Sequence, residues 1–227
     1  MFDLIRVGSF SALVALILPS FTGMTAWGST LKSGTIQGVI QFQKNPGAPS
    51  PSDFVIFSTR CTKTADLGIP VRISQENCAY KPRLSVAVSG QKLDIRNDDR
   101  IIHNSFSVSP VRFDTGQQKP QGSSLFTLSQ PGVAKIYCRV HPDMETMVLI
   151  LRNPCYARPS ADGTFVLEGL PNGAVDVRLW SPRLNKVLLN RVQVGKSIST
   201  VTFEVKPEML GPAPRKVTGC PVDNTSD

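Results

Sequence analysis

The chain of 227 residues is long enough for one large domain or two small ones, each with its own core. Its formal net charge of +8 favours acidic partners or surfaces. The basic residues are scattered and carry no nucleic-acid motif, so nucleic acid is not an expected partner.

The first 28 residues resemble a secretory signal peptide. Arg6 precedes the apolar run 10–18, Pro19 ends that run, and residues 26–28 supply the small residues of a cleavage site. The run is too short to cross a bilayer, so we expect no stable membrane span after signal removal. An uncleaved N-terminal anchor is the alternative. Export predicts a periplasmic or secreted protein in an oxidising compartment.

Short segments of alternating apolar and polar residues follow, separated by turns, as is typical of half-buried strands. The expected strands are residues 34–42, 54–58, 71–74, 78–82, 84–88, 93–96, 101–106, 125–128, 133–137, 146–151, 163–168, 174–180, 186–194 and 201–205. No segment keeps the apolar period of a helix, and 17 Gly with 18 Pro favour turns. The pattern predicts an all-β sandwich or barrel, followed by a flexible tail over 207–227.

The sequence between two of these strands, Tyr-Cys-Arg-Val-His-Pro-Asp-Met at 137–144, contains several metal-binding side chains. Cys138, His141 and Met144 place a thiolate, an imidazole and a thioether close together. These soft donors favour copper over calcium or magnesium, and blue-copper sites use two His, one Cys and a weak axial Met. The chain has only two histidines, so His103 is the candidate for the fourth ligand.

Other interpretations of this loop remain. Zinc is the competing metal, although its structural sites use four Cys or His ligands and seldom a Met. A Cys beside a His is also the arrangement of a catalytic nucleophile and its base, but no orienting group or oxyanion hole is evident in the sequence. The simplest alternative is a free Cys, a surface His and a core Met.

Five cysteines leave an exported protein with one unpaired thiol. If Cys138 binds a metal, the other four can form two disulfides, which is the number that a single-thiolate metal site allows. Our preferred pairing is Cys61 with Cys78 and Cys155 with Cys220. Four cysteines allow three connectivities, and the sequence does not choose among them.

Residues 71–151 resemble the cupredoxins, the type 1 or blue copper proteins. The resemblance rests on His103-Asn104, on Pro131-Gly132 and on Tyr137-Cys138-x2-His141-Pro142-x-Met144. The Cys-x2-His-x2-Met spacing is similar to the short ligand loop of amicyanin, whereas plastocyanins and azurins have longer loops. Cupredoxin-containing proteins labelled methylamine-utilisation-like are also similar. The resemblance implies a Greek-key β-sandwich that binds one type 1 copper ion per chain.

Matching positions give each residue of the loop an expected role. The resemblance implies imidazole ligation by His103 and His141 and thiolate ligation by Cys138. Met144 matches the axial thioether, and Met147 is its rival.

The resemblance also implies residues that lie beside the ligands. Asn104 resembles the residue that ties the first-ligand segment to the Cys loop, and Pro142 is expected next to the ligand set. Asp143 departs from amicyanin, where the residue after the proline is apolar. A carboxylate there would lower the reduction potential or face a basic partner.

The flanking segments resemble a second family, the carboxypeptidase regulatory-like (transthyretin-like) sandwich. The resemblance rests on Gly34-x-Ile-x-Gly38-x-Ile and Phe54-Val-Ile-Phe, and on the Asp-Gly and Leu-Pro-x-Gly turns within 162–179. It implies an accessory sandwich in two parts, 32–62 and 155–206, around a copper domain at 66–152. Two domains in tandem are the alternative.

These features together predict an exported one-electron carrier that is not an enzyme and acts between redox protein partners with acidic docking surfaces. A copper storage or delivery protein with the same ligands is the alternative. Copper oxidases and nitrite reductases need further centres built mainly from imidazoles, and two histidines leave none for them. A structural surface protein with a vestigial copper site is a further alternative.

Overall fold

The computed structural model describes residues 34–43, 49–213 and 220. The expected signal peptide and most of the expected tail lie outside the described residues. Within the described residues the chain forms strands and two short 3-10 helices, Pro51–Asp53 and Pro207–Met209, so the protein is all-β. None of the helices described is long and apolar enough to cross a membrane.

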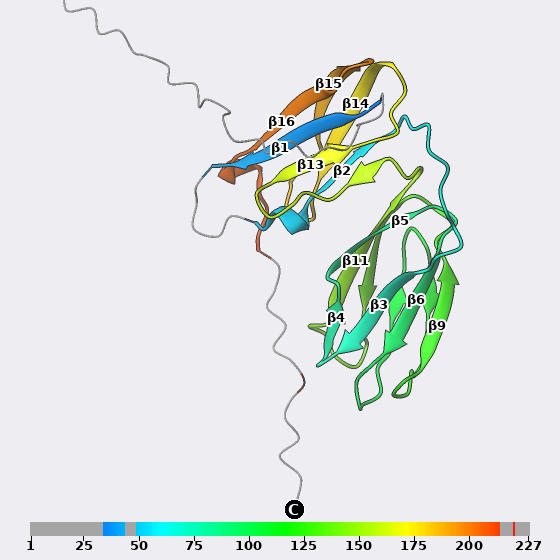
Figure 1. Ribbon diagram of the computed structural model, residues 1–227. Helices are drawn as coiled ribbons and strands as arrows, with labels where there is room; N and C mark the ends of the chain where they lie inside the picture. Colours follow the sequence, from blue (N-terminus) through cyan, green and yellow to red (C-terminus); the bar gives the residue numbers. More distant parts are fainter. Residues whose placement is uncertain (1–33, 44–48, 214–219, 221–227) are drawn as a thin grey trace, which may run out of the picture. The chain divides into compact units, whose positions relative to one another are not determined.

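Two sheets combine strands from the two ends of the described chain (Figure 1). The three-stranded sheet has the order β13 (Thr164–Leu167), β1 (Ile36–Phe42), β16 (Ser199–Val205), with β1 antiparallel to β13 and parallel to β16. The four-stranded sheet has the order β12 (Tyr156–Ala157), β2 (Val55–Ser58), β14 (Gly173–Trp180), β15 (Leu188–Val194).

Two further sheets use only the strands between β2 and β12. The five-stranded sheet has the order β5 (Leu84–Val88), β11 (Glu145–Leu151), β10 (Gly132–Tyr137), β7 (Phe106–Ser107), β8 (Phe113–Asp114). The other has the order β4 (Ala79–Lys81), β3 (Val71–Glu76), β6 (Lys92–Asn97), β9 (Ser123–Thr127).

Each pair of sheets encloses its own apolar core. Ile73 of β3 and Ile95 of β6 pack in one cluster with Ile136 of β10 and Ile150 of β11, so this cluster joins the sheets of the second pair. A separate cluster joins the sheets of the first pair and includes Ile36, Phe203, Ile56 and Val177. Inward and outward side chains alternate along these strands, which is why burial of one face leaves polar residues on the other. The fold is therefore built from two β-sandwiches.

The strand pairing bears on the division of the chain into domains. Among the described residues, β1 and β2 pair only with strands β12, β13, β14 and β16, which lie within 156–205. On this basis we propose the discontinuous division, with an accessory sandwich formed by 32–62 and 155–206 around a second domain at 66–152.

The segment 101–106 differs from the expected strand. Only Phe106 enters a strand, and His103 forms an isolated bridge with Gln118. His103, Asn104 and Ser105 are buried in succession. Local bonds take the place of a regular ladder here: the His103 backbone bonds Gln118, and Ser105 bonds Thr115 through Ser105 N–H to Thr115 Oγ1 and Thr115 N–H to Ser105 O.

The expected tail also begins too early. The 3-10 helix Pro207–Met209 is followed by Leu210, which bridges to Leu184. Asn185 N–H donates to Met209 O over 2.9 Å, and Gly211 N–H donates to Arg183 O over 2.7 Å. These backbone bonds fix residues that composition alone assigns to a flexible segment.

Candidate metal centre

The hairpin formed by β10 and β11 carries three of the four expected ligands. Tyr137 pairs with Glu145 across the hairpin, so the two ends of the loop 138–144 lie directly opposite each other. Inside the loop, Cys138 N–H donates to Met144 O over 3.3 Å, and Met144 N–H donates to His141 O over 3.0 Å. The loop thus closes through its own backbone bonds, which fix Cys138, His141 and Met144 relative to one another.

His103 reaches the same point from the segment that follows β6. Its backbone exchanges two hydrogen bonds with Gln118, of 3.1 and 2.7 Å, and its side chain is fully buried. Asn97, the last residue of β6, donates through Nδ2 to Ile101 O and Gln118 O, each over 2.8 Å. These bonds fix an irregular segment in place without a regular strand.

Three donor atoms meet at the centre. Nδ1 of His103 and Nδ1 of His141 lie 3.1 Å apart, and the Cys138 sulfur lies 3.9 Å from each. The point equidistant from the three atoms is about 2.1 Å from each, close to the metal–ligand lengths of about 2.0 to 2.3 Å for N and S donors. The three residues therefore fit one metal ion.

The exposure of the ligating side chains is unequal. Cys138 is 4% exposed, Met144 1% and His103 0%, whereas His141 is only partly buried. Solvent and any partner therefore reach the centre through the His141 ring.

The two candidate thioethers lie in different surroundings. Met144 packs in the same apolar cluster as Cys138, whereas Met147 packs against a separate cluster that contains Leu84 and Leu149. Met144, and not Met147, therefore shares a core with Cys138.

The Cys138 thiol is set up to be a thiolate. Burial by itself raises its pKa, but hydrogen bonds from His103, from the backbone N–H groups of Asn104 and His141 and from the His141 ring outweigh burial and lower the pKa to about 6. Burial alone would lower the pKa of His103, yet bonds to Cys138 and Asp99 raise it. A thiolate is the form of Cys that binds metals, so the centre is electrostatically ready for a cation.

Asp99 orients His103 from the side away from the other donors. Its Oδ2 lies 2.7 Å from His103 Nε2. Burial raises the pKa of Asp99, but the bonds from Cys78 N–H, His103 and Asn77 N–H lower it overall, so the carboxylate is ionised and Nε2 is the donor. With Nε2–H held by Asp99, Nδ1 is the nitrogen that can give up its proton and bind a metal. Asp99 was not among the residues expected at the site.

Asn104 makes different contacts from those expected. Its side-chain Nδ2 donates to Asp114 Oδ1 over 2.6 Å and to Gly116 O over 3.0 Å, and not to the Cys loop. The loop is reached indirectly, because Arg139 donates to Asp114 Oδ2 over 3.0 Å. The direct tie is the Asn104 backbone N–H, which bonds the Cys138 sulfur. The backbone N–H of Asn104 therefore makes the link to the Cys loop that was expected of its side chain.

Pro142 and Asp143 lie on the outer side of the loop, and both are exposed. Among the described ion pairs, none involves Asp143. Its carboxylate is therefore free to act on approaching molecules next to the His141 ring.

The disulfides differ from the preferred pairing. Cys61 bonds Cys155 and Cys78 bonds Cys220, and Cys138 is free. The first bond follows from the sheet: Cys61 lies just after β2 and Cys155 just before β12, and these two strands pair. The expected Cys61–Cys78 and Cys155–Cys220 bonds are wrong because sequence order does not reveal which strands become neighbours.

Comparison with known proteins gives partial structural likenesses only. No protein-family profile matches the chain, and no curated protein matches it. A purple cupredoxin from Nitrosopumilus maritimus is similar at 22% identity over 35% of this chain and 98% of its own, with a TM-score of 0.34. A mutant of amicyanin in its reduced form is similar at 20% identity over 45% of this chain and 94% of its own, with a TM-score of 0.34.

A third similar structure is an enzyme, the Cu-containing nitrite reductase from Thermus scotoductus SA-01. The identity is 15%, the match covers 49% of this chain and 28% of the reductase, and the TM-score is 0.35. The chain thus spans just over a quarter of the reductase. All three likenesses concern less than half of this chain.

Proposed function

We propose that this protein is an exported type 1 copper protein that carries one electron at a time between redox partners. The observation that carries this proposal is the triangle of Cys138 Sγ and the Nδ1 atoms of His103 and His141. Two imidazoles, one thiolate and a buried thioether are the donor set of such sites. Bound copper would supply the one-electron redox change.

The surrounding residues support a site that barely reorganises. His103 is fully buried and bonded on both sides, and the loop 138–144 is closed by its own backbone bonds. Donors held this firmly keep nearly the same positions in both oxidation states of the metal. A small change in geometry is what fast electron transfer needs, because little energy is then spent on rearranging ligands.

Electrons enter and leave through the ring of His141 in this proposal. The neighbouring Val140 is 53% exposed, and Ile101 and Ile102, which precede His103, are 40% and 42% exposed. Exposed apolar side chains next to the proposed ligands in the sequence would allow brief docking, because apolar contact needs no exact charge pairing.

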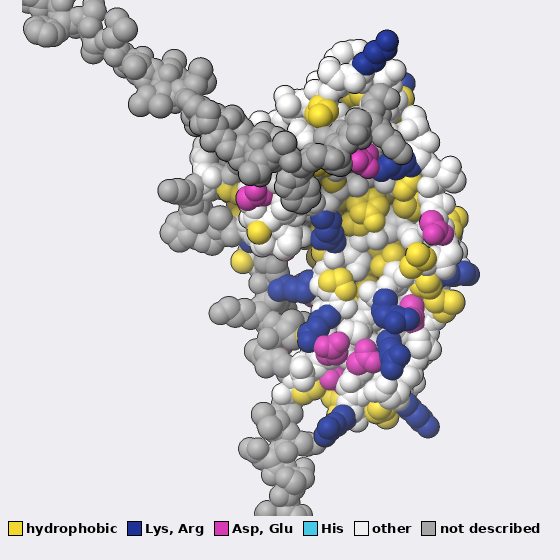
Figure 2. All heavy atoms as spheres, in the orientation of Figure 1, with side chains coloured by type: hydrophobic (Ala, Val, Ile, Leu, Met, Phe, Trp, Pro, Cys, Tyr) yellow, Lys and Arg dark blue, Asp and Glu magenta, His cyan; other side chains and the backbone are white. Residues whose placement is uncertain are grey.

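The expected partner is a redox protein with an acidic docking surface, since the chain carries a net charge of +8. Figure 2 shows Lys and Arg side chains interspersed with Asp and Glu on the face drawn, with apolar groups between them. Such mixed charges favour weak, fast-exchanging contacts over one permanent complex.

Export to the periplasm or beyond the cell is supported by the two disulfides, Cys61–Cys155 and Cys78–Cys220. Disulfides persist in oxidising compartments. A role without substrate chemistry is supported by the histidine count, because the proposed centre uses both imidazoles of the sequence.

The deciding experiment is the visible absorption and EPR spectrum of the copper-loaded protein. We expect an intense visible band that Cys138→Ala abolishes and the control Val140→Ala keeps, because the band arises from the bond between thiolate and copper. Persistence of the band in Cys138→Ala would contradict the proposal. Reversible voltammetry with slow metal loss supports a carrier, whereas ready transfer of Cu(I) to an acceptor protein contradicts it.

A further inference from the structure

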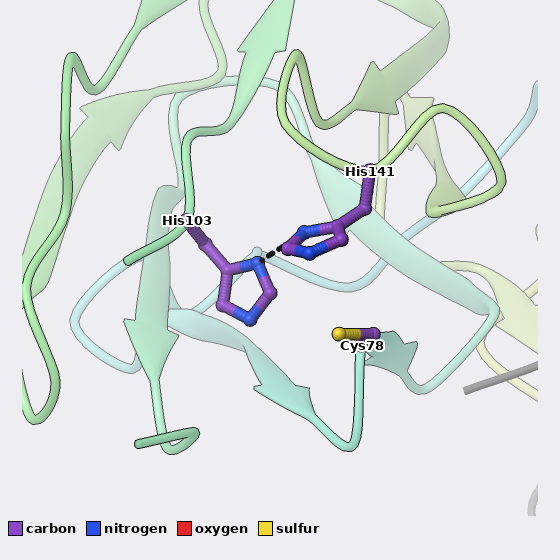
Figure 3. Close-up of side chains that lie close together, drawn as sticks. All are labelled: Cys78, His103 and His141. Atoms are coloured by element: carbon purple, nitrogen blue, oxygen red, sulfur yellow. Dashed lines mark hydrogen bonds between the residues drawn. The ribbon is translucent and has the colours of Figure 1, made fainter. Parts of the chain in front are cut away.

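A second sulfur lies beside the metal centre. The ligand atoms of Cys78, His103 and His141 lie within 4.8 Å of one another, and Figure 3 shows the Cys78 sulfur near both imidazole rings. Cys78 is 2% exposed and belongs to the same apolar cluster as Cys138 and Met144. The proposed copper site has no role for this sulfur.

Cys78 does not act as a thiolate in this state, because it is bonded to Cys220. A disulfide sulfur carries no negative charge and is a poor metal donor, whereas a thiolate is a strong one. Cys78 could therefore serve as a further ligand once its disulfide is opened. Its sulfur lies beside the proposed ligands Cys138, His103 and His141.

The position of Cys78 is maintained by two restraints. Asn77 and Cys78 both adopt left-handed backbone conformations, with φ of 53° and 54°, which residues other than glycine rarely adopt. Their N–H groups donate to the two oxygens of Asp99, over 2.5 Å and 3.0 Å. The disulfide is the second restraint. Opening it leaves the backbone of the turn held by the Asp99 bonds and by the pairing of Glu76 with Ala79, while the Cys78 side chain gains freedom to rotate toward the histidines.

We propose that the Cys78–Cys220 disulfide decides which metal the centre takes. With the bond formed, the centre offers one thiolate, two imidazoles and a thioether, which is the donor set for copper. With the bond open, Cys78 joins Cys138 and the two histidines in a closed four-ligand site of two Cys and two His, the set that zinc prefers. This inference rests on the proposed function for the identity of the first three ligands.

The chemistry of the switch is a thiol–disulfide exchange. A dithiol reductant supplies two electrons and two protons, the bond between Cys78 and Cys220 breaks, and the two sulfurs of the reductant become joined. Zinc then binds Cys78 as the thiolate, and the thiol proton passes to water. When the disulfide forms again, Cys78 can no longer bind zinc, and the affinity of the centre for zinc falls relative to its affinity for copper.

Three variants test the proposal. Cys220→Ser frees the Cys78 thiol permanently, Cys78→Ser leaves only Cys220, and the double variant has neither. Co²⁺, a spectroscopic substitute for zinc, gives a near-ultraviolet charge-transfer band that grows with the number of bound thiolates. We expect this band to be about twice as intense in Cys220→Ser as in the double variant, and zinc to bind at least tenfold more tightly by chelator competition.

The matched comparisons separate ligation from loss of the disulfide bond. Cys78→Ser and the double variant also lack the bond, so both should give the single-thiolate band of the oxidised protein. Wild-type protein treated with a dithiol should match Cys220→Ser, which gives a second measurement if that variant does not fold. Equal bands in Cys220→Ser and the double variant, or no change on reducing the wild type, would overturn the proposal.

Failure of the proposed function gives a different result. A copper-loaded wild type without the intense visible band contradicts the electron carrier but leaves the doubled cobalt band intact. A copper-loaded wild type with that band, together with equal cobalt bands in the variants, contradicts only the metal switch.

Discussion

Asp99 Oδ2 lies 2.7 Å from His103 Nε2, on the opposite side of the imidazole from the nitrogen that faces Cys138 and His141. The carboxylate thus both fixes the tautomer of a ligand and places a negative charge next to the metal position. Under the proposed function, this charge would favour the more highly charged oxidation state of bound copper.

We expect Asp99→Asn to raise the reduction potential of the copper form by about 60 mV, the one-electron equivalent of a tenfold change in equilibrium constant. Removal of the negative charge destabilises Cu(II) relative to Cu(I). Protein-film voltammetry measures the shift. Asp98→Asn is the matched control, since Asp98 pairs with Arg96 and makes the same charge change without contact to His103. An equal shift in both variants would show a general charge effect and no special role for Asp99.

Substitution of the two methionines should separate the axial ligand from its neighbour. Met144→Leu should raise the potential and change the EPR spectrum, because loss of a thioether donor disfavours Cu(II). Met147→Leu should change neither, since Met147 packs against a different cluster. Both swaps conserve volume and should cost less than about 1.5 kcal/mol of stability by urea unfolding. A spectral change in Met147→Leu alone would reverse the assignment.

The metal-free protein should show a pH dependence due to Cys138. The pKa of this thiol falls from 9.0 to about 6 on folding, so its contribution to stability is fully present above pH 9 and is lost as the pH falls through about 6. The difference in unfolding free energy between wild type and Cys138→Ser should therefore shrink from pH 9 to pH 6. A difference that stays constant over this range would contradict the lowered pKa.

The exposed side chain of Val140, next to His141 in the loop, should influence the rate of electron exchange. Val140→Asp should slow electron self-exchange between copies of the copper protein about tenfold, because a charge at this exposed position opposes close approach of two like surfaces. NMR line broadening in mixtures of the two oxidation states measures the rate. Val166→Asp, at an exposed position of β13, should leave the rate unchanged. The visible spectrum should be the same in both variants.

The Cys61–Cys155 bond should matter for stability and not for the metal. Replacing both residues by Ser should cost about 2 to 5 kcal/mol of unfolding free energy, the usual effect of losing a native disulfide. Both cysteines pack in the apolar core that contains Ile36 and Phe203. None of the proposed ligands belongs to that core, so the copper spectrum should not change. A changed spectrum would show that the two cores are coupled.

The proximity of Cys138 and His141 was predictable because it is local: both lie in one hairpin loop, and their donor atoms are 3.9 Å apart. Met144, at the end of the same loop, packs in the same apolar cluster as Cys138. His103 followed from the count of histidines in the sequence. The alternation of apolar residues likewise predicted most strands, since burial of one face of a sheet requires it.

The contacts around the ligands were not predictable in the same way. Asp99 acquires its role only because the turn at Asn77 and Cys78 supplies two N–H groups to it. The disulfide partners depend on which strands become neighbours, as with Cys61 and Cys155 beside the paired strands β2 and β12. These contacts join residues far apart in the chain, so local sequence patterns do not predict them.

The pairing of β1 with β16 has a consequence for the order of folding. Ile36 pairs with Ser199, so the first described strand finds this neighbour only after nearly all of the chain has been synthesised. Strands β3 to β11 need nothing beyond Leu151 to complete their own two sheets. Contacts between residues distant in sequence form slowly. The sandwich of β3 to β11 can therefore fold before β1 and β2 have paired with the strands that follow it.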